Sequence, residues 1–151
     1  MSQNKKSRDA KNMIALSLKC RGAIMTHRAK LMIRLIMGHS NSDICPLAYS
    51  INEAANLLFV QNIPWDEIKI TKDIYPAVAK KLGKSPSATA RSVERLVNRC
   101  WDKMTPQQKQ QYIGRDLEDI TSTTDFVVYM AYYLYYGKPY FEILHTQFFA
   151  L

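Results

Sequence analysis

The sequence predicts an all-α protein, a compact bundle of about six helices that contains a helix-turn-helix. Apolar residues recur at helical spacing along the chain, and no alternating pattern long enough for a strand is visible. Residues typical of helix starts and ends separate these apolar segments. The chain has 151 residues, 47% hydrophobic and 23% charged, so its length and composition fit one globular domain.

The N-terminal segment predicts a helix that follows a polar, basic start. Residues 13–37 are helix-permissive and largely apolar, and Gly22 is the point at which this helix would break. We expect residues 1–27 to be a basic, partly helical extension. Residues 28–136 should form the helix-turn-helix domain, and residues 137–151 an aromatic tail that packs on the core or contacts another copy.

A loop and a second helix follow this segment. Residues 38–46 are rich in turn residues and are predicted as a loop. Ser50-Ile51-Asn52-Glu53 has the pattern of a capping box, in which a serine caps the helix and a glutamate follows three residues later. This pattern predicts a helix that begins at Ser50 and runs to about Gln61.

Two helices with a tight turn between them come next. Thr71 is placed to cap a helix over residues 72–82, and Gly83 is a natural terminator because glycine adopts the left-handed conformation easily. Ser85 and Pro86 then have the preferred order for a helix start, a serine cap followed by proline at the first position. We expect this helix to run from Pro86 to about Met104.

The C-terminal part predicts two further helices. Thr105 and Pro106 open a short helix that carries Gln107–Tyr112 and that Gly114 breaks. Ser122 or Thr123 caps a last helix with apolar residues at helical spacing, which Gly137 ends. The residues from this last helix that should face the core are Phe126, Val127, Met130, Ala131 and Leu134.

The positive charge is concentrated in two segments. The chain has 21 Lys and Arg against 13 Asp and Glu, a formal net charge of +8. Residues 1–40 carry a net charge of +8 and residues 71–109 one of +6, whereas residues 41–70 and 110–151 carry −3 each. One basic face is the surface expected of a phosphate-binding protein, although chance clustering on a solvated surface gives the same pattern.

Composition and motifs argue against several classes of protein. No apolar run reaches the ~18 residues of a membrane helix, so we expect no membrane partner. The odd count of three cysteines, without zinc-ligand spacing, indicates reduced thiols in the cytoplasm. His39, Asp43 and Cys45 share one loop, where we expect solvent-exposed side chains and no metal site. We therefore predict that the protein is not an enzyme and that it has neither catalytic residues nor a cofactor.

The segment from Lys72 to Lys103 carries the functional pattern, a helix, a tight turn with glycine and a second helix. Apolar side chains of the second helix recur as a core-facing stripe: Val93, Leu96, Val97, Cys100, Trp101 and Met104. Polar and cationic side chains repeat every four residues on another face: Ser87, Arg91, Arg95 and Arg99. Three guanidiniums in line suit a DNA groove, because Arg bonds guanine bidentately or holds phosphates.

The expected roles follow from how a helix-turn-helix docks on DNA. The start of the second helix meets base edges and later residues meet the backbone. We expect one set to read bases: Ser87, Ala88, Arg91 and Arg95. We expect a second set to hold DNA phosphates: Lys80, Lys81, Lys84, Ser85, Thr89 and Arg99.

A protein–protein interaction module that does not bind DNA is the rival prediction. An ordinary amphipathic helix gives the same spacing, and its arginines would be solvated or paired with acids. Glu94 lies three residues from Arg91, and Asp102 three residues from Arg99, both at pairing distance on a helix. The rival function therefore predicts arginines paired with acids and weak binding to duplex DNA at any salt concentration.

The same segment resembles the C-terminal effector domain of the master response regulator of endospore formation in Gram-positive bacteria. The resemblance extends over residues 30–135, and its matching stretches are Ile70-Thr71-Lys72, Tyr75-Pro76, Ala79-Lys80-Lys81, Trp101, Glu53-Ala54 and Ser122–Leu134. It implies a six-helix bacterial domain that binds a short duplex DNA element. It also implies contact with RNA polymerase, to activate or repress transcription. We further expect the protein to bind DNA as a homodimer.

The chain departs from this family in two places. Placed at residues 87–91, the family's pattern Ser-Arg-Val-Glu-Arg matches at Ser87 and Arg91, while Ala88 and Ala90 stand in place of the first Arg and the Glu. A lost Arg–guanine contact is worth ~1–3 kcal/mol, so we expect a DNA element other than the family's. Family members also carry a receiver domain ahead of this one, and the residues before Arg28 are too few for a receiver.

Overall fold

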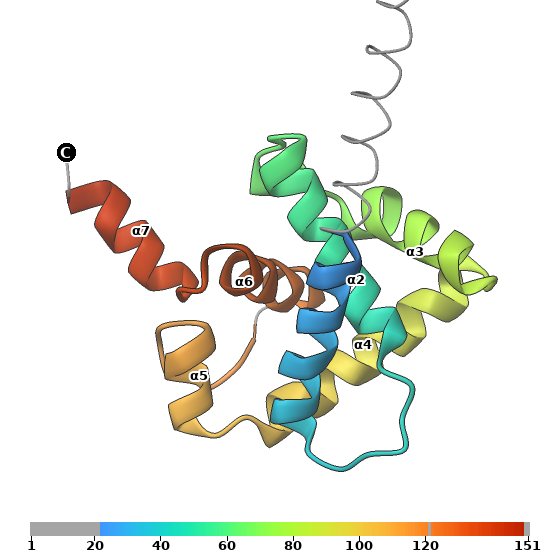
Figure 1. The fold of residues 1–151 in the computed structure, drawn as a ribbon, viewed down its shortest axis with the longest axis horizontal. Coiled ribbons are helices and arrows are strands. Elements are labelled where there is room, and N and C mark those ends of the chain that lie inside the picture. Colours follow the sequence, from blue (N-terminus) through green and yellow to red (C-terminus); the bar gives the residue numbers. More distant parts are fainter. Residues whose placement is uncertain (1–21, 121, 150–151) are drawn as a thin grey trace, which may run out of the picture.

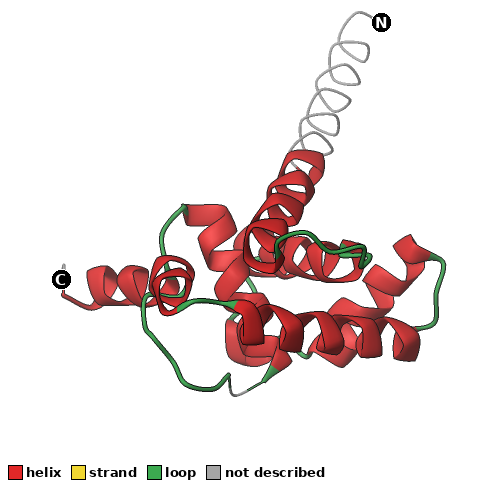
Figure 2. Cartoon of the chain, turned by 90° about the horizontal axis from the view of Figure 1, so that it is seen from below, coloured by secondary structure: helices red, strands yellow, loops and turns green. Residues whose placement is uncertain are grey.

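The computed structural model describes residues 22–120 and 122–149, and every regular element in this part of the chain is helical, which confirms the all-α prediction. The α-helices are a helix over residues 22–37, α2 (Cys45–Ala55), α3 (Tyr75–Leu82), α4 (Pro86–Lys103), α5 (Pro106–Tyr112), α6 (Thr123–Tyr136) and α7 (Tyr140–Phe149) (Figure 1). Short π-helical and 3₁₀ segments join them: η1 (Asn56–Val60), η2 (Trp65–Glu67) and η3 (Ile70–Ile74). Figure 2 shows how these helices are connected.

α2 lies at the centre of the bundle and packs against α6, α3 and α4. Ile51 and Ala54 of α2 are fully buried, as are Phe126 and Val127 of α6. Apolar burial contributes roughly 25 cal/mol per Å² of surface removed from water, so these contacts hold the helices in place. The framework therefore fixes the position of α3 and α4.

The helix over residues 22–37 covers one side of this core. Its inward side chains follow helical periodicity and are buried: Ala29, Met32, Ile33, Ile36 and Met37. Its last turn is held from α4 and α5, because Lys103 Nζ donates to the Met37 carbonyl at 3.2 Å and Gln108 Nε2 donates to the Leu35 carbonyl at 3.3 Å. The helix runs without a break through the domain boundary expected between residues 27 and 28. The part of the predicted helix over residues 13–21 lies outside the described residues.

The predicted start of the second helix was wrong. α2 begins at Cys45, with Pro46 in its first turn, where the fixed φ of proline suits a helix start. The carboxylate of Asp43 accepts a hydrogen bond from the Cys45 N–H at 3.0 Å. Ser50 is therefore buried inside the helix, and its hydroxyl donates to the Pro46 carbonyl at 2.7 Å instead of capping.

The helix before the turn also starts differently from the prediction. The chain becomes helical at Ile70, in the π-helical segment η3, and α3 continues from Tyr75. Thr71 makes no capping bond; instead the carboxylate of Asp73 accepts from the Lys69 N–H at 2.8 Å. The predicted terminator is confirmed, since Gly83 has a φ of +64° and the Lys84 N–H donates to the Ala79 carbonyl at 3.0 Å.

The start of α4 is as predicted. Ser85 is the N-cap, and its hydroxyl accepts from the Ala88 N–H at 3.2 Å, with Pro86 in the first turn. The predicted core-facing stripe is buried throughout: Val93, Leu96, Val97, Cys100, Trp101 and Met104. The cap at Ser85 and the buried stripe together fix which face of α4 points outward.

The later helices confirm their predicted caps. Thr105 and Gln108 form a capping box at α5, and Ser122 caps α6 by accepting from the Asp125 N–H at 3.1 Å. Gly137 ends α6 with a φ of +69°.

The predicted aromatic tail contains a helix, α7, whose first turn packs on the core. The Phe141 N–H donates to the Ile113 carbonyl at 3.1 Å, and Phe141 contacts the buried core. Gly114 has a φ of +96°, and a Cβ built on it would lie 3.2 Å from the Cβ atoms of Phe141 and Pro139. A glycine at this position therefore allows the close approach of α7.

Candidate nucleic-acid interface

α3, the Gly83 turn and α4 form a helix-turn-helix with a cationic outer surface. The buried stripe of α4 faces α2 and α6, so the opposite side chains are exposed: Ser87, Arg91, Arg95 and Arg99. The lysines at the end of α3 and in the turn, Lys80, Lys81 and Lys84, are exposed as well. Seven of the predicted contact residues thus lie on the surface of two consecutive helices and their turn.

The arginines of α4 are not neutralised by neighbouring acids. Among the residues that the structure describes, no carboxylate forms an ion pair with Arg91, Arg95 or Arg99. Arg99 instead donates a hydrogen bond to the Ser42 hydroxyl, in the loop before α2. The pairing with Glu94 and Asp102 that the interaction-module function requires is absent from this surface.

Thr89 is the exception among the predicted contact residues. Its side chain is fully buried, its hydroxyl donates to the Ser85 carbonyl at 3.0 Å, and its N–H donates to the same carbonyl at 3.0 Å. Both of its donors are therefore used inside the first turn of α4. The prediction that Thr89 holds a DNA phosphate was wrong, because position 89 turns inward by helical geometry although its residue type is polar.

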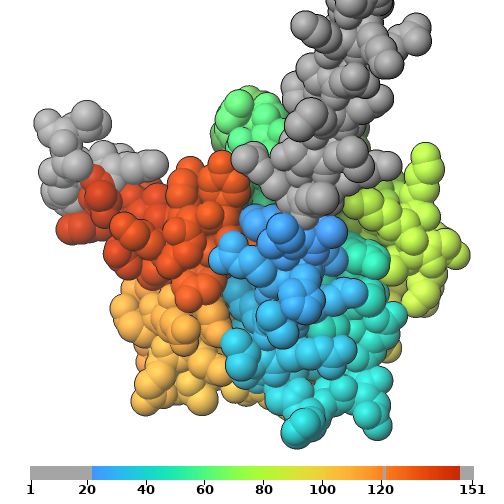
Figure 3. All heavy atoms as spheres, in the orientation of Figure 1, coloured from blue at the N-terminus to red at the C-terminus, as the bar shows by residue number. Residues whose placement is uncertain are grey.

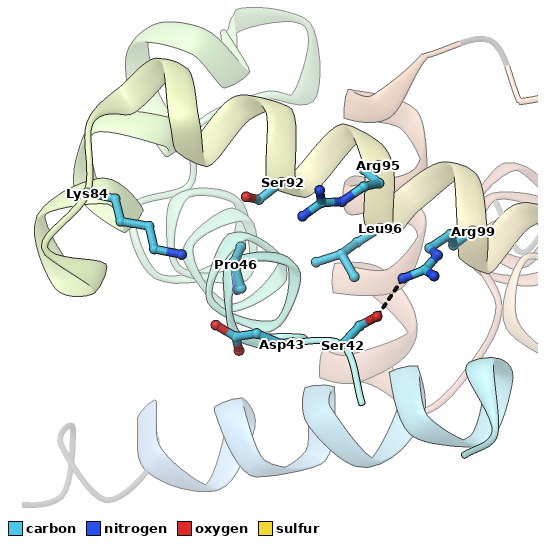
Figure 4. A pocket seen from close by; sticks show the side chains of 8 residues that line it. All are labelled: Ser42, Asp43, Pro46, Lys84, Ser92, Arg95, Leu96 and Arg99. Carbon is cyan, nitrogen blue, oxygen red and sulfur yellow. Dashed lines mark hydrogen bonds between the residues drawn. The ribbon is translucent and has the colours of Figure 1, made fainter. Parts of the chain in front are cut away.

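A hollow of about 390 Å³ lies between α4 and the loop before α2 (Figure 4). Three cations line it, Lys84 from the turn and Arg95 and Arg99 from α4, together with Ser92. The loop contributes the hydroxyl of Ser42, which holds Arg99, and the carboxylate of Asp43. No local sequence pattern indicates this loop as a wall of the interface, because its contact with α4 joins residues 57 positions apart.

Asp43 is the acid within this group of cations. The hydrogen bond from the Cys45 N–H lowers the pKa of Asp43, partial burial opposes this effect, and the charges of Lys84 and Lys30 lower it further. The carboxylate therefore remains charged at neutral pH and at mildly acidic pH. Its negative charge lies within the field of Lys84, in the hollow that Arg95 and Arg99 also line.

The family comparison bears on this same segment. The family model for the sporulation initiation factor Spo0A C-terminal domain matches residues 48–133, which include α3, the turn, α4 and most of α6. The chain belongs to this family. The family consists of DNA-binding effector domains of transcription regulation in sporulation, which confirms the resemblance predicted from the sequence. No curated protein and no solved structure is significantly similar to the chain.

The family's recognition pattern fits the chain better one turn later than the placement at residues 87–91. Val93, Glu94 and Arg95 reproduce the last three residues of Ser-Arg-Val-Glu-Arg in order, and Arg91 and Ser92 precede them in exchanged positions. The earlier placement matches at only two positions. In the later register the Glu and the last Arg of the pattern are retained as Glu94 and Arg95, and both are exposed.

The tyrosines of α6 lie away from this surface and contact other aromatic rings. Tyr135 stacks on Phe59 with ring centroids 4.4 Å apart, and Tyr140 of α7 meets the edge of Trp65 at 5.0 Å. These rings join α6 and α7 to η1 and η2 by aromatic packing. Within the described part of the chain, no helix is long and apolar enough to cross a bilayer.

Proposed function

We propose that the protein is a sequence-specific, double-stranded DNA-binding transcription regulator that uses α4 as its recognition helix. The observation that carries the proposal is the row of exposed arginines on α4, unpaired with acids among the described residues, in a chain that belongs to a DNA-binding family. The cap at Ser85 and the buried stripe hold this helix rigidly, so its outer side chains are positioned before DNA arrives.

The spacing of the arginines suits the major groove. Arg91 and Arg99 are eight residues apart, about 12 Å along the helix, and a helix of ~10–12 Å diameter fits the ~12 Å wide groove. We assign base contacts to Ser87, Ala88, Arg91 and Arg95, the arginines being suited to guanine. Glu94, exposed beside them, suits the amino group of cytosine.

The cations around the recognition helix suit the DNA backbone. We assign phosphate contacts to Lys80, Lys81, Lys84, Ser85 and Arg99, because these side chains are exposed at the turn and at the far end of α4. The family's role in transcription extends the proposal to a bacterial, cytoplasmic protein that contacts RNA polymerase and binds DNA as a homodimer.

The test is selection of duplexes from a random pool, followed by fluorescence-anisotropy titration of the selected duplex and a scrambled one at two salt concentrations. The proposal predicts tight binding that weakens steeply with salt and a clear preference for the selected duplex. Equal affinity for both duplexes would refute sequence specificity. No binding at low salt would refute DNA binding and favour the interaction module, whose first candidate surface is the exposed pair Tyr135 and Tyr136.

A further inference from the structure

The helix over residues 22–37 lies outside the segment that matches the family, yet it borders the helix-turn-helix. In Figure 3 it occupies the centre of the face shown, in blue, between yellow-green α3 and the orange to red C-terminal helices. A second hollow, of about 510 Å³, separates this helix from α2 and α3. Its walls include Lys30 of this helix, Tyr49 and Asn52 of α2, and Lys81 of α3.

The chemistry of this hollow suits an anion. Two lysines face it from different segments, Lys30 from the helix over residues 22–37 and Lys81 from the last turn of α3. Among the described residues, no carboxylate lines it, in contrast to the hollow beside α4, which contains Asp43. The ring of Tyr49 lies 5.7 Å from the Lys30 ammonium, which restrains that side chain at the wall of the hollow.

The cations of the second hollow lie next to the cations of the proposed interface. Lys81 belongs to the helix-turn-helix and lies three residues before Lys84, which lines the hollow beside α4. Lys30 and Lys84 both act electrostatically on Asp43, so the loop before α2 lies within the field of both lysines. A DNA strand that meets Lys84 at the turn therefore has cations beyond it, on α3 and then on the helix over residues 22–37.

We propose that Lys30 and Lys81 together hold a backbone phosphate of the bound DNA, so that the helix over residues 22–37 is a third part of the DNA interface. The proposal rests on the proposed function and adds a contact outside the family-matched segment. Because the ligand is the phosphate group, the contact strengthens binding to every sequence and carries no base preference.

The test compares Lys30→Gln with a matched control, Arg28→Gln. Both variants remove one positive charge from the same helix, but residues 28 and 30 are two positions apart, about 200° around the helix axis, and Arg28 is exposed away from the hollow. Affinity for selected and scrambled duplexes is measured over a range of salt concentrations. Lys30→Arg keeps the charge, and Lys81→Gln removes the other half of the site.

Lys30→Gln should reduce the magnitude of the slope of log association constant against log salt concentration by about 0.9. This change corresponds to roughly eightfold weaker binding at 0.1 M salt, and it should be equal on both duplexes. Lys81→Gln should act similarly, while Arg28→Gln and Lys30→Arg should keep the wild-type slope. Equal slopes for Lys30→Gln and Arg28→Gln, with normal binding by the wild type, would overturn this inference alone. Failure of the wild type to bind duplex DNA would overturn the proposed function and this inference with it.

Discussion

Asp43 is a single side chain whose charge opposes the function of its surroundings. It lines the hollow that holds Lys84, Arg95 and Arg99, and its pKa is lowered, so it stays ionised within the proposed DNA interface. A fixed negative charge at this place repels the phosphates of nonspecifically bound DNA. In a specific complex, the base contacts of the arginines offset this repulsion. Asp43 is therefore expected to reduce binding to unrelated DNA.

The variant Asp43→Asn should bind scrambled duplex more tightly than the wild type. Asparagine keeps an oxygen that accepts from the Cys45 N–H, so the start of α2 is preserved while the charge is lost. A charge near 4 Å from a phosphate in water is worth about 1 kcal/mol, which corresponds to about a fivefold gain in affinity. The measurement is anisotropy titration at low salt, with Asp66→Asn on η2 as control. Unchanged affinity of Asp43→Asn would show that phosphates do not approach this hollow.

The individual helices show what a sequence determines locally. The caps Ser85, Thr105 and Ser122 were predictable because capping depends on a few adjacent residues. The start of α2 was not, since Ser50 has the pattern of a capping box but Pro46 and Asp43 start the helix earlier. A local pattern gives two candidate starts here, and the packing of the whole helix decides between them.

Loss of the cap on α4 should destabilise the fold measurably. Ser85→Ala removes the acceptor for the Ala88 N–H, and such a change costs about 1 kcal/mol of unfolding free energy, within a range of roughly 0.5–2 kcal/mol. Ser85→Asp keeps a capping oxygen and should retain most of the stability. Urea denaturation followed by circular dichroism gives both values. Equal midpoints for wild type and Ser85→Ala would mean that Gly83 and Thr89 alone fix the helix start.

For the molecule as a whole, the sequence predicted the helical class and the helix-turn-helix but not how distant segments meet. The outward face of α4 followed from periodicity, yet the Ser42–Arg99 contact joins residues 57 positions apart, so no local pattern indicates it. Thr89 shows the opposite failure, because a polar residue type suggested the surface and the fold buries it. Geometry between segments decides the first case, and the position of Thr89 on the inward face of α4 decides the second.

The buried core makes the fold sensitive to alkaline pH. Burial raises the pKa of Tyr75 to about 12, with the charge of Glu94 adding to the effect, and burial raises the pKa of Cys100 to about 12 against the opposing charge of Lys103. Both groups keep their protons in the folded state above the pH at which the unfolded chain releases them. Stability from these groups is therefore complete below about pH 9 and is lost as the pH rises towards 12.

Tyr75→Phe tests this dependence. The Tyr75 hydroxyl is buried with no hydrogen-bond partner among the described residues, so its removal should leave the unfolding free energy at pH 7 unchanged or raise it by up to about 1 kcal/mol. The variant should also lose less stability than the wild type between pH 10 and 12. Tyr135→Phe, at a half-exposed position, is the control. A loss of more than about 1 kcal/mol at pH 7 would mean that this hydroxyl does have a partner.

The most direct measurement is the affinity of the double variant Arg91→Gln/Arg95→Gln for the selected and scrambled duplexes, beside Arg28→Gln/Lys138→Gln, which removes the same charge from exposed positions outside α4. Two lost arginine–base contacts, at ~1–3 kcal/mol each, predict at least about a 30-fold loss on the selected duplex and a much smaller loss on the scrambled one. The control should keep the preference for the selected duplex. If the α4 double variant and the control double variant have the same affinity for each of the two duplexes, α4 does not read the DNA sequence.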